Sequence, residues 1–299
     1  FDVLREELLR YPRYMEYIFE DRTFDKPICR VVSGLYENRA SGSPLTVLIK
    51  NDPDAAYSGD ALRPCTGDYG RFIKGTADYC PDGFSAESHI LSLLIAGSIA
   101  RQMLAEKGIY IGMHVSSIGN VNDDVLDFSK LSFDEFSTLL KNEMPVLNSA
   151  VAGYYRKIIK DSIVLGDSLG GIVECFVTGL SAGHGDPLFS SVQSIVAGYL
   201  FALPGVTGLE FGEGFAVSKK QGRKFNDLIV CKNGEAVCET NNYGGLDGPY
   251  TNGLPLVVKA AVAPEPNIGS SQKTLSRLDL SETSYSSNKT DCAPLKVAV

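Results

Sequence analysis

Apolar residues recur at helical spacing in four parts of the chain, a pattern typical of amphipathic or buried helices. In the first part, Leu4, Leu8 and Tyr11 keep this spacing until Pro12 interrupts it, because proline has no N–H to continue a helix. The last part, "SSVQSIVAGYLFAL", is mostly apolar and small, so we expect it to be buried on most of its faces. The predicted helices cover 1–20, 85–107, 131–160 (one or two helices with acidic starts) and 190–203.

Runs rich in β-branched residues predict strands between and after these helices. Such runs lie at 28–50 (two strands and a polar connection), 109–119, 162–179 and 254–262. The dipeptide Asn233-Gly234 is a strong signal for a type I′ hairpin turn. Two segments show neither the helical nor the strand pattern. The segment 52–83 is rich in proline and glycine and is interpreted as irregular, and the chain from Gly269 onward is interpreted as a polar tail.

The hairpin bears on the chemistry of the cysteines. A type I′ turn at Asn233-Gly234 puts Cys231 opposite Ala236, which leaves Cys238 diagonal to Cys231 at roughly 7–8 Å, too far for an unstrained disulfide. The chain has seven cysteines, an odd number, with no CxxC, and too few other ligands near them for zinc. We therefore expect reduced thiols, as in cytosolic proteins, and no metal site.

Composition excludes several classes of protein. With 36 acidic and 28 basic residues the net charge is −8, and no block of Lys or Arg occurs, which argues against a nucleic-acid partner. The longest apolar runs, such as 90–100, are shorter than the roughly 20 residues that span a bilayer, so no membrane association is expected. The charged, amphipathic N-terminal segment does not resemble a secretion signal. The chain begins at Phe1, which suggests that it starts partway into its natural domain.

A sequence similarity between two segments of the chain suggests that the fold contains a duplicated unit. The segments "ASGSPLTVLIK" (40–50) and "YTNGLPLVVKAAV" (250–262) share a small residue, a glycine, a spacer, a proline and then a β-branched run. A domain with an internal pseudo-twofold would produce this similarity, but a chance match between two such short segments is about as probable. We treat residues 1–299 as a single domain.

The Gly-rich run 240–253, "TNNYGGLDGPYTNG", poses the main functional question. Its glycines permit positive φ and close approach of other atoms, so it forms either an elaborate turn or a surface shaped against a ligand. Familiar catalytic signatures are missing, because the chain contains neither GxSxG nor GxxxxGK[ST]. Among the histidines, His89 and His114 are interpreted as structural, and His184 in a Gly-rich loop permits either interpretation.

Several loops in one order resemble the chorismate synthase family. Its members carry D-S-[IV]-G-G, then G-L-P-x-G-x-G-x-P-x-F, an S-I-P-A-V-K-G block ending in G-x-G-F, N-D, and a T/S-N-x-x-G-G-I-L-G-G run. The similar segments here are 167–171, 179–189, 202–215, 226–227 and 240–253. Earlier in the chain, "ASGSPLTVLIKN" resembles the family's T-T-G-T-P segment and "LRPCTGDY" its R-P-G-H-A-D-Y, so the resemblance covers nearly the whole sequence.

The resemblance implies an α+β fold, a β-α-β sandwich with helices packed between antiparallel sheets and an internal pseudo-twofold, usually assembled as a homotetramer. It implies the shikimate-pathway reaction that converts 5-enolpyruvylshikimate 3-phosphate to chorismate and phosphate, a 1,4-elimination by a carbon–oxygen lyase. Reduced FMN is required although the reaction has no net redox change. The setting is aromatic amino acid biosynthesis, and we expect a cytoplasmic protein.

The resemblance also assigns functional residues. In "NKTDCAP", which stands for the family's G-R-H-D-P, Asp291 keeps the catalytic aspartate and Lys289 a positive charge. The Gly-rich run corresponds to the loop that lies against the flavin, which favours the ligand-shaped interpretation. The predicted cofactor-binding residues are Phe84, Ser85, Pro204, Gly205, Gly248, Ala263, Pro264, Glu265, Pro266, Asn267 and Lys289.

Several cationic or titratable positions of the family pattern are substituted. Thr66 and Thr290 occupy two histidine positions, and Thr207 occupies a lysine position. The K-P-T-x-S motif reads 263–267, "APEPN", so it loses a lysine and gains a carboxylate, and Glu87 stands near an arginine position. Each change weakens a site that must bind a phosphorylated dicarboxylate and a flavin phosphate.

Two functional readings follow. In the first, the chain is a chorismate synthase; in the second, it is a catalytically inactive relative that keeps the scaffold as a binding or assembly subunit. The family's opening F-G-x-x-x-G-E-S-H-G motif has no counterpart here, and neither does the C-terminal helix that follows a strand aligned with "PLKVAV" (294–299). We therefore expect both ends of the domain to be missing.

Overall fold

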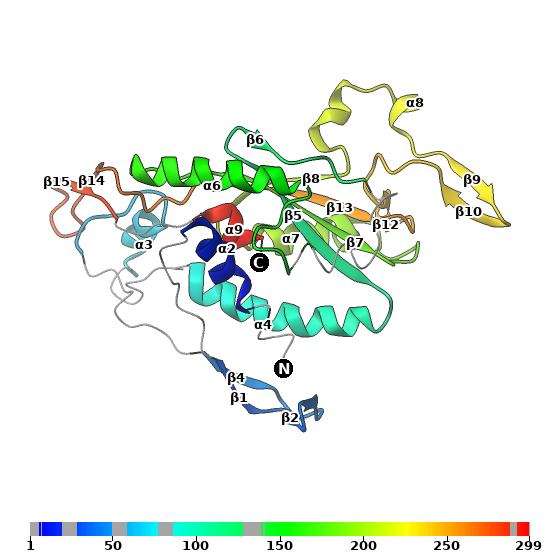
Figure 1. Ribbon diagram of the computed structural model, residues 1–299, viewed down its shortest axis with the longest axis horizontal. Coiled ribbons are helices and arrows are strands. Elements are labelled where there is room, and N and C mark those ends of the chain that lie inside the picture. Colours follow the sequence, from blue (N-terminus) through cyan, green and yellow to red (C-terminus); the bar gives the residue numbers. More distant parts are fainter. Residues whose placement is uncertain are drawn as a thin grey trace.

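Helices and antiparallel strands alternate along the chain in a computed structural model (Figure 1). The structure describes residues 6, 8–19, 29–49, 59–76, 86–127, 139, 141–287 and 292–298. Its α-helices are α2 (Arg10–Ile18), α3 (Asp68–Lys74), α4 (Ala86–Ala105), α6 (Ser149–Val164), α7 (Val192–Phe201), α8 (Gly222–Phe225) and α9 (Ala293–Val297). Its 3-10 helices are η2 (Leu188–Ser190) and η3 (Gly214–Lys219). Its strands are β1 (Cys29–Ser33), β2 (Leu35–Tyr36), β3 (Arg39–Ala40), β4 (Thr46–Ile49), β5 (Tyr110–Ile118), β6 (Val121–Asn122), β7 (Gly171–Thr178), β8 (Val206–Phe211), β9 (Ile229–Lys232), β10 (Glu235–Cys238), β11 (Leu246–Asp247), β12 (Tyr250–Thr251), β13 (Leu256–Val262), β14 (Gln272–Leu275) and β15 (Glu282–Tyr285).

A five-stranded antiparallel sheet with the strand order β6-β5-β7-β13-β8 forms the centre of the fold. Its register pairs His114 of β5 with Glu174 of β7. It also pairs Glu174 with Lys259 of β13, and Lys259 with Glu210 of β8. Because residues directly opposite one another share a face of a sheet, these four side chains form a charged row across one face.

Helix α4 lies between two β layers (Figure 1). On one side, Ile95 of α4 is buried in a cluster that includes Val47 and Ile49 of β4, which pairs with β1. On the other side, α4 contacts β5 of the five-stranded sheet. This arrangement, a helix packed between antiparallel sheets, is the predicted β-α-β sandwich. The two similar sequence segments contain β4 and β13, which lie in different sheets, and the internal pseudo-twofold stays a prediction.

The main hydrophobic cluster joins α2, α6 and α9 to the sheet. Tyr14 of α2, Tyr155 of α6 and Leu295 of α9 are fully buried in it beside Val115 of β5. The hydroxyl of Tyr155 donates a hydrogen bond to the carbonyl of Val115 at 3.1 Å, which satisfies the one polar atom of this side chain. These helices thereby fix one end of the sheet, next to the candidate site described below.

The structure confirms the main predicted elements. The segments 85–107, 190–203, 109–119 and 254–262 correspond to α4, α7, β5 and β13. The turn between β9 and β10 has φ of 54° at Asn233 and 85° at Gly234, as a type I′ turn requires. Cys231 pairs with Ala236, as predicted.

The predicted interruption near Pro12 is confirmed: Glu6 and Leu8 are helical, Leu9 forms a turn, and a new helix, α2, begins at Arg10. Pro12 lies in the first turn of α2, where its missing N–H has no helical partner to lose.

Two other helix predictions are wrong in local detail. The segment predicted as irregular contains α3, which lies between Gly67 and Gly75, both in the left-handed region. Helix α6 has no acidic residue in its first turn; instead the side chain of Asn148 caps it by accepting from the N–H of Ala150 at 3.0 Å.

Two predictions near the C-terminal end are also wrong. The segment after Gly269 is not a plain tail, because it forms the β14–β15 hairpin. The segment aligned with a strand, "PLKVAV", forms α9, with a proline in the first turn, where it suits a helix start. Leu295 of α9 is buried in the main cluster, so this helix packs into the core.

Helix α7 is far less buried than its composition predicts. No residue of α7 is buried, and Tyr199 is 77% exposed. Ile195 and Phe201 are exposed as well. An apolar helix with exposed faces is typical of a surface that a partner covers.

Gly153 in α6 offers a test of helix stability. It is exposed, and a Cβ at this position would meet nothing within 4 Å. Gly153→Ala should therefore raise the free energy of unfolding by about 0.5–1 kcal/mol, because glycine loses more backbone entropy in a helix than alanine does. Urea denaturation measures this change, and a loss of stability would show that the site is more crowded than described.

Candidate active site

The R-P motif forms a compact loop around one carboxylate. Asp68 accepts two hydrogen bonds from the guanidinium of Arg63, at 2.7 and 3.0 Å, and another from Arg71. Burial alone would raise the pKa of Asp68, but the hydrogen bonds and the charge of these arginines lower it to about 2. Thr66, at a histidine position of the family, donates to the carbonyl of Arg63 at 3.0 Å, so it supports the turn and exchanges no proton near neutral pH.

The β14–β15 hairpin connects this loop to the predicted cofactor loop 263–267. On one side the N–H of Leu62 donates to the carbonyl of Leu275 at 2.9 Å. On the other side the hydroxyl of Tyr285 donates to the side-chain carbonyl of Asn267 at 2.9 Å. The segment that appeared to be a tail in the sequence therefore holds two motif loops in a fixed relation.

The cofactor loop is tied to its neighbours by three contacts. The N–H of Ala263 donates to the carbonyl of Gly205 at 2.8 Å, and Ser168 Oγ donates to the carbonyl of Glu265 at 2.7 Å. The carboxylate of Glu265 lies 3.5 Å from the ammonium of Lys296 in α9. The negative charge that this loop gains is thus paired with a lysine, which reduces the repulsion expected from the sequence.

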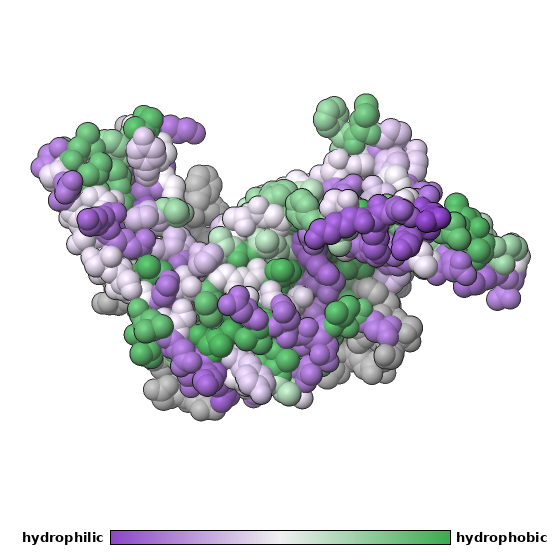
Figure 2. Space-filling model, turned by 90° about the horizontal axis from the view of Figure 1, so that it is seen from above, coloured by the Kyte–Doolittle hydropathy of each residue, from purple (hydrophilic) through white to green (hydrophobic). Residues whose placement is uncertain are grey.

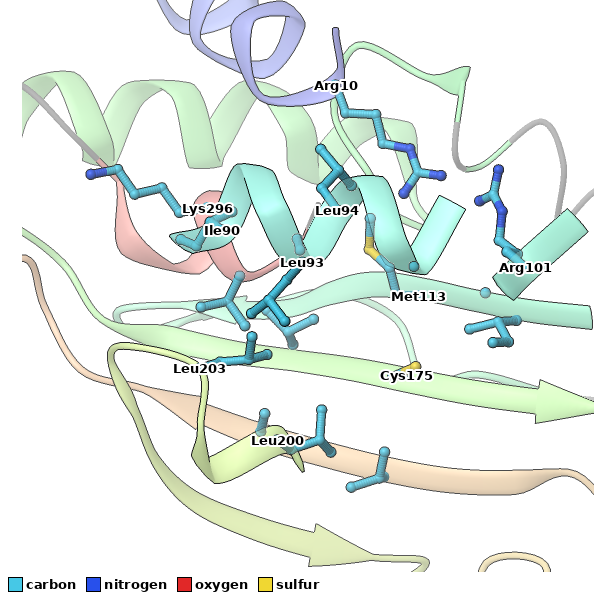
Figure 3. A pocket seen from close by; sticks show the side chains of 18 of the residues that line it. Arg10, Ile90, Leu93, Leu94, Arg101, Met113, Cys175, Leu200, Leu203 and Lys296 are labelled. Carbon is cyan, nitrogen blue, oxygen red and sulfur yellow. The ribbon is translucent and has the colours of Figure 1, made fainter. Parts of the chain in front are cut away.

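An apolar cavity of about 310 Å³ lies between α4 and the central sheet (Figure 3). Pro204, a predicted cofactor residue, lines this cavity. It precedes Gly205, whose carbonyl accepts the hydrogen bond from Ala263 of the cofactor loop. Cys175 lies on the wall formed by the sheet, and burial raises the pKa of its thiol to about 11, so the thiol stays protonated at neutral pH. The other apolar lining residues include Leu93, Leu94, Met113, Val173, Leu200, Leu203, Val258 and Ala260.

Three cations belong to the cavity lining: Arg10 of α2, Arg101 of α4 and Lys296 of α9. Figure 3 shows the two arginines on one side of the cavity and Lys296 on the other. The stem of Lys296 lines the cavity, and its ammonium reaches outward to Glu265. Apolar walls with cations at the edges suit a ligand that combines a ring system with anionic groups.

Gly248 lies apart from the other predicted cofactor residues. It belongs to the β11–β12 turn, which precedes β13, whereas Ala263 follows β13. A strand of this length separates them by roughly 20 Å. The turn is anchored to the loop that contains His184: Thr251 donates to the carbonyl of His184 at 2.9 Å and accepts from its N–H at 3.0 Å. Within one chain, the predicted residues thus form two groups at opposite ends of β13.

Asp227 organises the Gly-rich run. Its carboxylate accepts from the backbone N–H groups of Asn242 at 2.8 Å and Tyr243 at 3.0 Å, and from Thr240 Oγ1 at 2.6 Å. Gly245 adopts a φ of 82°, and a Cβ there would lie 2.6 Å from the Cα of Leu256. The glycine is required by close backbone packing at this position, so part of the run is a packed turn and not a ligand surface.

A buried charge network lies on the opposite face of the sheet from the cavity. His114 is fully buried, with Nδ1 3.1 Å from Asp123 Oδ2 and Nε2 2.8 Å from Glu174 Oε2. Asp123 also accepts from the N–H groups of Leu147 at 2.6 Å and Asn148 at 3.0 Å. Burial alone would lower the pKa of His114, but its hydrogen bonds to the two carboxylates raise it. His114 is therefore structural, as predicted, and links the sheet to the start of α6.

Four predicted site residues lie outside the described residues. They are Phe84, Ser85, Lys289 and Asp291. Pro264 and Pro266 belong to the cofactor loop, and the carbonyl of Pro266 accepts from Gln272 Nε2 at 3.1 Å. The assignment of all these residues to a cofactor stays a prediction.

Sequence reasoning missed Arg10, Arg101 and Lys296. Arg101 offered one signal, because it is a charged residue that follows a long apolar helix segment. Arg10 and Lys296 offered none, since they come from opposite ends of the chain and meet at the cavity only in the fold. Among the described residues, no group of three or more His, Cys, Asp or Glu side chains is placed to hold a metal ion. No helix in the described part of the chain has the length and apolar character needed to cross a membrane.

Comparison with known proteins places these features in one family. A sequence profile of the family described as "Chorismate synthase" matches residues 5–299. The chorismate synthase of Thermococcus kodakarensis is 33% identical over 281 residues, covering 91% of this chain and 76% of the relative. That of Pyrococcus abyssi is 32% identical over 267 residues, covering 86% and 72%. A solved structure titled "Crystal Structure of Chorismate Synthase" superposes with a TM-score of 0.71 at 24% identity, over 89% of this chain and 76% of that one, which shows the same α+β fold. The chain belongs to the chorismate synthase family.

Proposed function

We propose that this chain carries out the family reaction, elimination of phosphate from 5-enolpyruvylshikimate 3-phosphate to give chorismate, with reduced FMN held at the cavity and the cofactor loop 263–267. The single observation that supports this most is the apolar cavity, with cations at its edges, that adjoins the loop through Pro204 and Lys296. The inactive alternative rests on the substitutions and on the missing first motif, with no positive observation behind it, and one of the substitutions, Glu265, is offset by a nearby lysine.

The residues present suit the flavin. A cavity of about 310 Å³ is at the lower end of the range of pockets that bind cofactors, roughly 300–1,000 Å³. Its aliphatic walls suit the ring system, and Arg10, Arg101 and Lys296 suit anionic groups. When bound, the reduced flavin supplies an electron-rich ring next to the substrate.

The reaction makes two demands on the protein itself. The bond from carbon to the phosphate oxygen breaks while a ring proton leaves, so cations must hold the departing phosphate and a base must take the proton. Arginine and lysine side chains meet the first demand, and we assign the second to Asp291 on the strength of the family motif. Exclusion of water by the apolar walls would strengthen each of these charge interactions.

We further propose a cytoplasmic homo-oligomer, a tetramer by family. The exposed apolar residues of α7, including Tyr199, and the exposed Leu188 and Phe189 of η2 support association with other copies. Predicted cofactor residues at both ends of β13 agree with a site that is completed on assembly.

An anaerobic assay with the natural full-length protein tests the proposal. Chorismate formation from 5-enolpyruvylshikimate 3-phosphate with reduced FMN should proceed within about tenfold of an ordinary family member, a difference under 1.4 kcal/mol in barrier. Flavin binding without chorismate or phosphate release would instead establish the inactive binding protein. Heat-treated protein and oxidised FMN are the controls.

A further inference from the structure

Two substituted side chains of the cofactor loop, Glu265 and Asn267, contact each other and the elements next to the loop. Asn267 Nδ2 donates to Glu265 Oε1 at 3.0 Å, and Asn267 Oδ1 accepts from the hydroxyl of Tyr285 at 2.9 Å. Glu265 Oε2 lies 3.5 Å from Lys296 Nζ. In the family motif a shorter side chain, serine, stands at the position of Asn267. The motif therefore does not assign these contacts.

We propose that Tyr285 is a positioning residue for the flavin: through Asn267 it keeps the carboxylate of Glu265 away from the phosphate of the cofactor. The inference rests on the proposed function, in which the loop 263–267 holds reduced FMN. Figure 3 shows that the stem of Lys296 lies along the cavity and that its ammonium points out of it. Because Glu265 Oε2 lies beside that ammonium, the carboxylate is also turned away from the cavity.

The backbone contacts of the loop do not determine where this carboxylate points. Ser168 Oγ holds only the carbonyl of Glu265, and a glutamate side chain has three rotatable bonds of its own. The direction of the carboxylate therefore depends on its side-chain contacts, one of which comes from Asn267. An amide that donates to Glu265 presents its oxygen to the other side, where the hydroxyl of Tyr285 donates to it. The hydroxyl thus fixes the orientation of the amide.

Tyr285 is held in place by the β14–β15 hairpin. The register of the hairpin pairs it with Gln272, whose Nε2 donates to the carbonyl of Pro266 in the cofactor loop at 3.1 Å. Both members of this pair therefore bond to the loop. At the other end of β14 the hairpin is attached to the segment that begins the R-P loop. The hairpin is a rigid support between the two motif loops, and Tyr285 connects it to the carboxylate of Glu265.

Loss of the hydroxyl should act through charge and not through the shape of the site. Without its donor the amide of Asn267 can turn, and the carboxylate of Glu265 loses a directed contact. A carboxylate that can approach a phosphate weakens binding by repulsion, most strongly where water is excluded. Riboflavin has the same ring as FMN without the phosphate, so it lacks the group that would be repelled. The two flavins therefore distinguish this role from a general loss of structure.

Tyr285→Phe removes the hydroxyl and keeps the ring. In anaerobic titrations of the reduced flavins, this variant should bind FMN at least about fivefold more weakly and riboflavin less than about twofold more weakly. Asn267→Ala interrupts the same chain of contacts and should give the same selective loss. Tyr154→Phe is the matched control, because Tyr154 is exposed on α6 and the same change there should alter neither affinity.

A second background tests the charge directly. Glu265→Gln keeps the size of the side chain and removes its charge, so adding Tyr285→Phe to it should change FMN affinity by less than about twofold. Three results would each overturn the role of Tyr285 while leaving flavin binding in place: equal losses for FMN and riboflavin, no loss for FMN in Tyr285→Phe, or an undiminished loss in the Glu265→Gln background. If the wild-type protein binds neither flavin, the proposed function itself fails, and the role of Tyr285 with it.

Discussion

Replacing His114 with leucine is expected to cost about 3–5 kcal/mol of stability, enough to unfold a domain of ordinary stability in part or completely. His114 lies between the carboxylates of Asp123 and Glu174, and it is fully buried. Leucine fills similar space but leaves two carboxylates without their shared cation. The loss is therefore set by uncompensated buried charge and not by a cavity.

The geometry indicates that the ring is an imidazolium. Both ring nitrogens face carboxylate oxygens, and an ionised carboxylate only accepts, so each nitrogen must donate. Asp123 is held ionised by two backbone N–H groups, and Lys259 lies 3.6 Å from Glu174. Two positive and two negative charges then balance in the network. Three other polar groups surround this network. Asp124 accepts a hydrogen bond from the side chain of Asn148, and the hydroxyl of Tyr155 donates one to the carbonyl of Val115. Glu210 lies opposite Lys259 in the register of the sheet.

The pH dependence of stability follows from the raised pKa of His114. Its contribution is fully present below the unfolded value, about 6.5, and is lost as the pH rises through the higher folded value. The difference in unfolding free energy between the wild type and His114→Gln should therefore be largest below pH 6.5 and shrink at more alkaline pH. Urea denaturation across this range measures it.

His184→Gln is the control for this experiment, because His184 is exposed and its ring is bonded to Ser181 Oγ at 3.0 Å, away from the sheet interior. That variant should change stability by less than about 0.5 kcal/mol at every pH. A His114→Gln deficit that stays constant with pH, or a cost of His114→Leu below 1 kcal/mol, would show that the ring is neutral and that one carboxylate holds the proton.

The pattern of apolar and turn residues predicted those helices, strands and turns whose structure depends mainly on their own sequence. The long apolar helix α4, the buried strand β13 and the Asn233-Gly234 turn each carry a strong period or turn signal. The β14–β15 hairpin carries none, because its four-residue strands are largely polar and depend on contacts such as that of Leu275 with Leu62. Helix α3 is short and depends on left-handed glycines at both ends.

In the candidate site, too, the sequence did not predict contacts between residues that are far apart along the chain. The motif resemblance identified the cofactor loop and the R-P loop, because those segments keep their spacing along the chain. It could not identify Lys296 as the partner of Glu265, since 31 positions separate them and no periodic pattern connects α9 to the loop. The loss of charge in the motif was visible in the sequence, whereas the pairing of Glu265 with a lysine from another element was visible only in three dimensions.

Filling the cavity should abolish most flavin binding without harming the fold. Gly97 of α4 lines the cavity, and a Cβ there would meet nothing within 4 Å. Gly97→Leu adds a branched side chain to a space of about 310 Å³, so the ring of a bound flavin would have to compete with it. We expect FMN and riboflavin affinities each to fall at least tenfold, about 1.4 kcal/mol, in anaerobic titrations. Stability should be unchanged or rise by up to about 1 kcal/mol, because leucine favours a helix more than glycine does.

The matched control is Gly153→Leu, the same substitution in an exposed helix position away from the cavity. It should share the gain in stability and leave both flavin affinities unchanged. Gly97→Leu should therefore weaken binding of FMN and riboflavin alike, whereas Gly153→Leu should weaken neither. If Gly97→Leu binds both flavins as tightly as Gly153→Leu does, the flavin ring does not occupy the cavity between α4 and the sheet, and the cofactor must bind elsewhere on the protein.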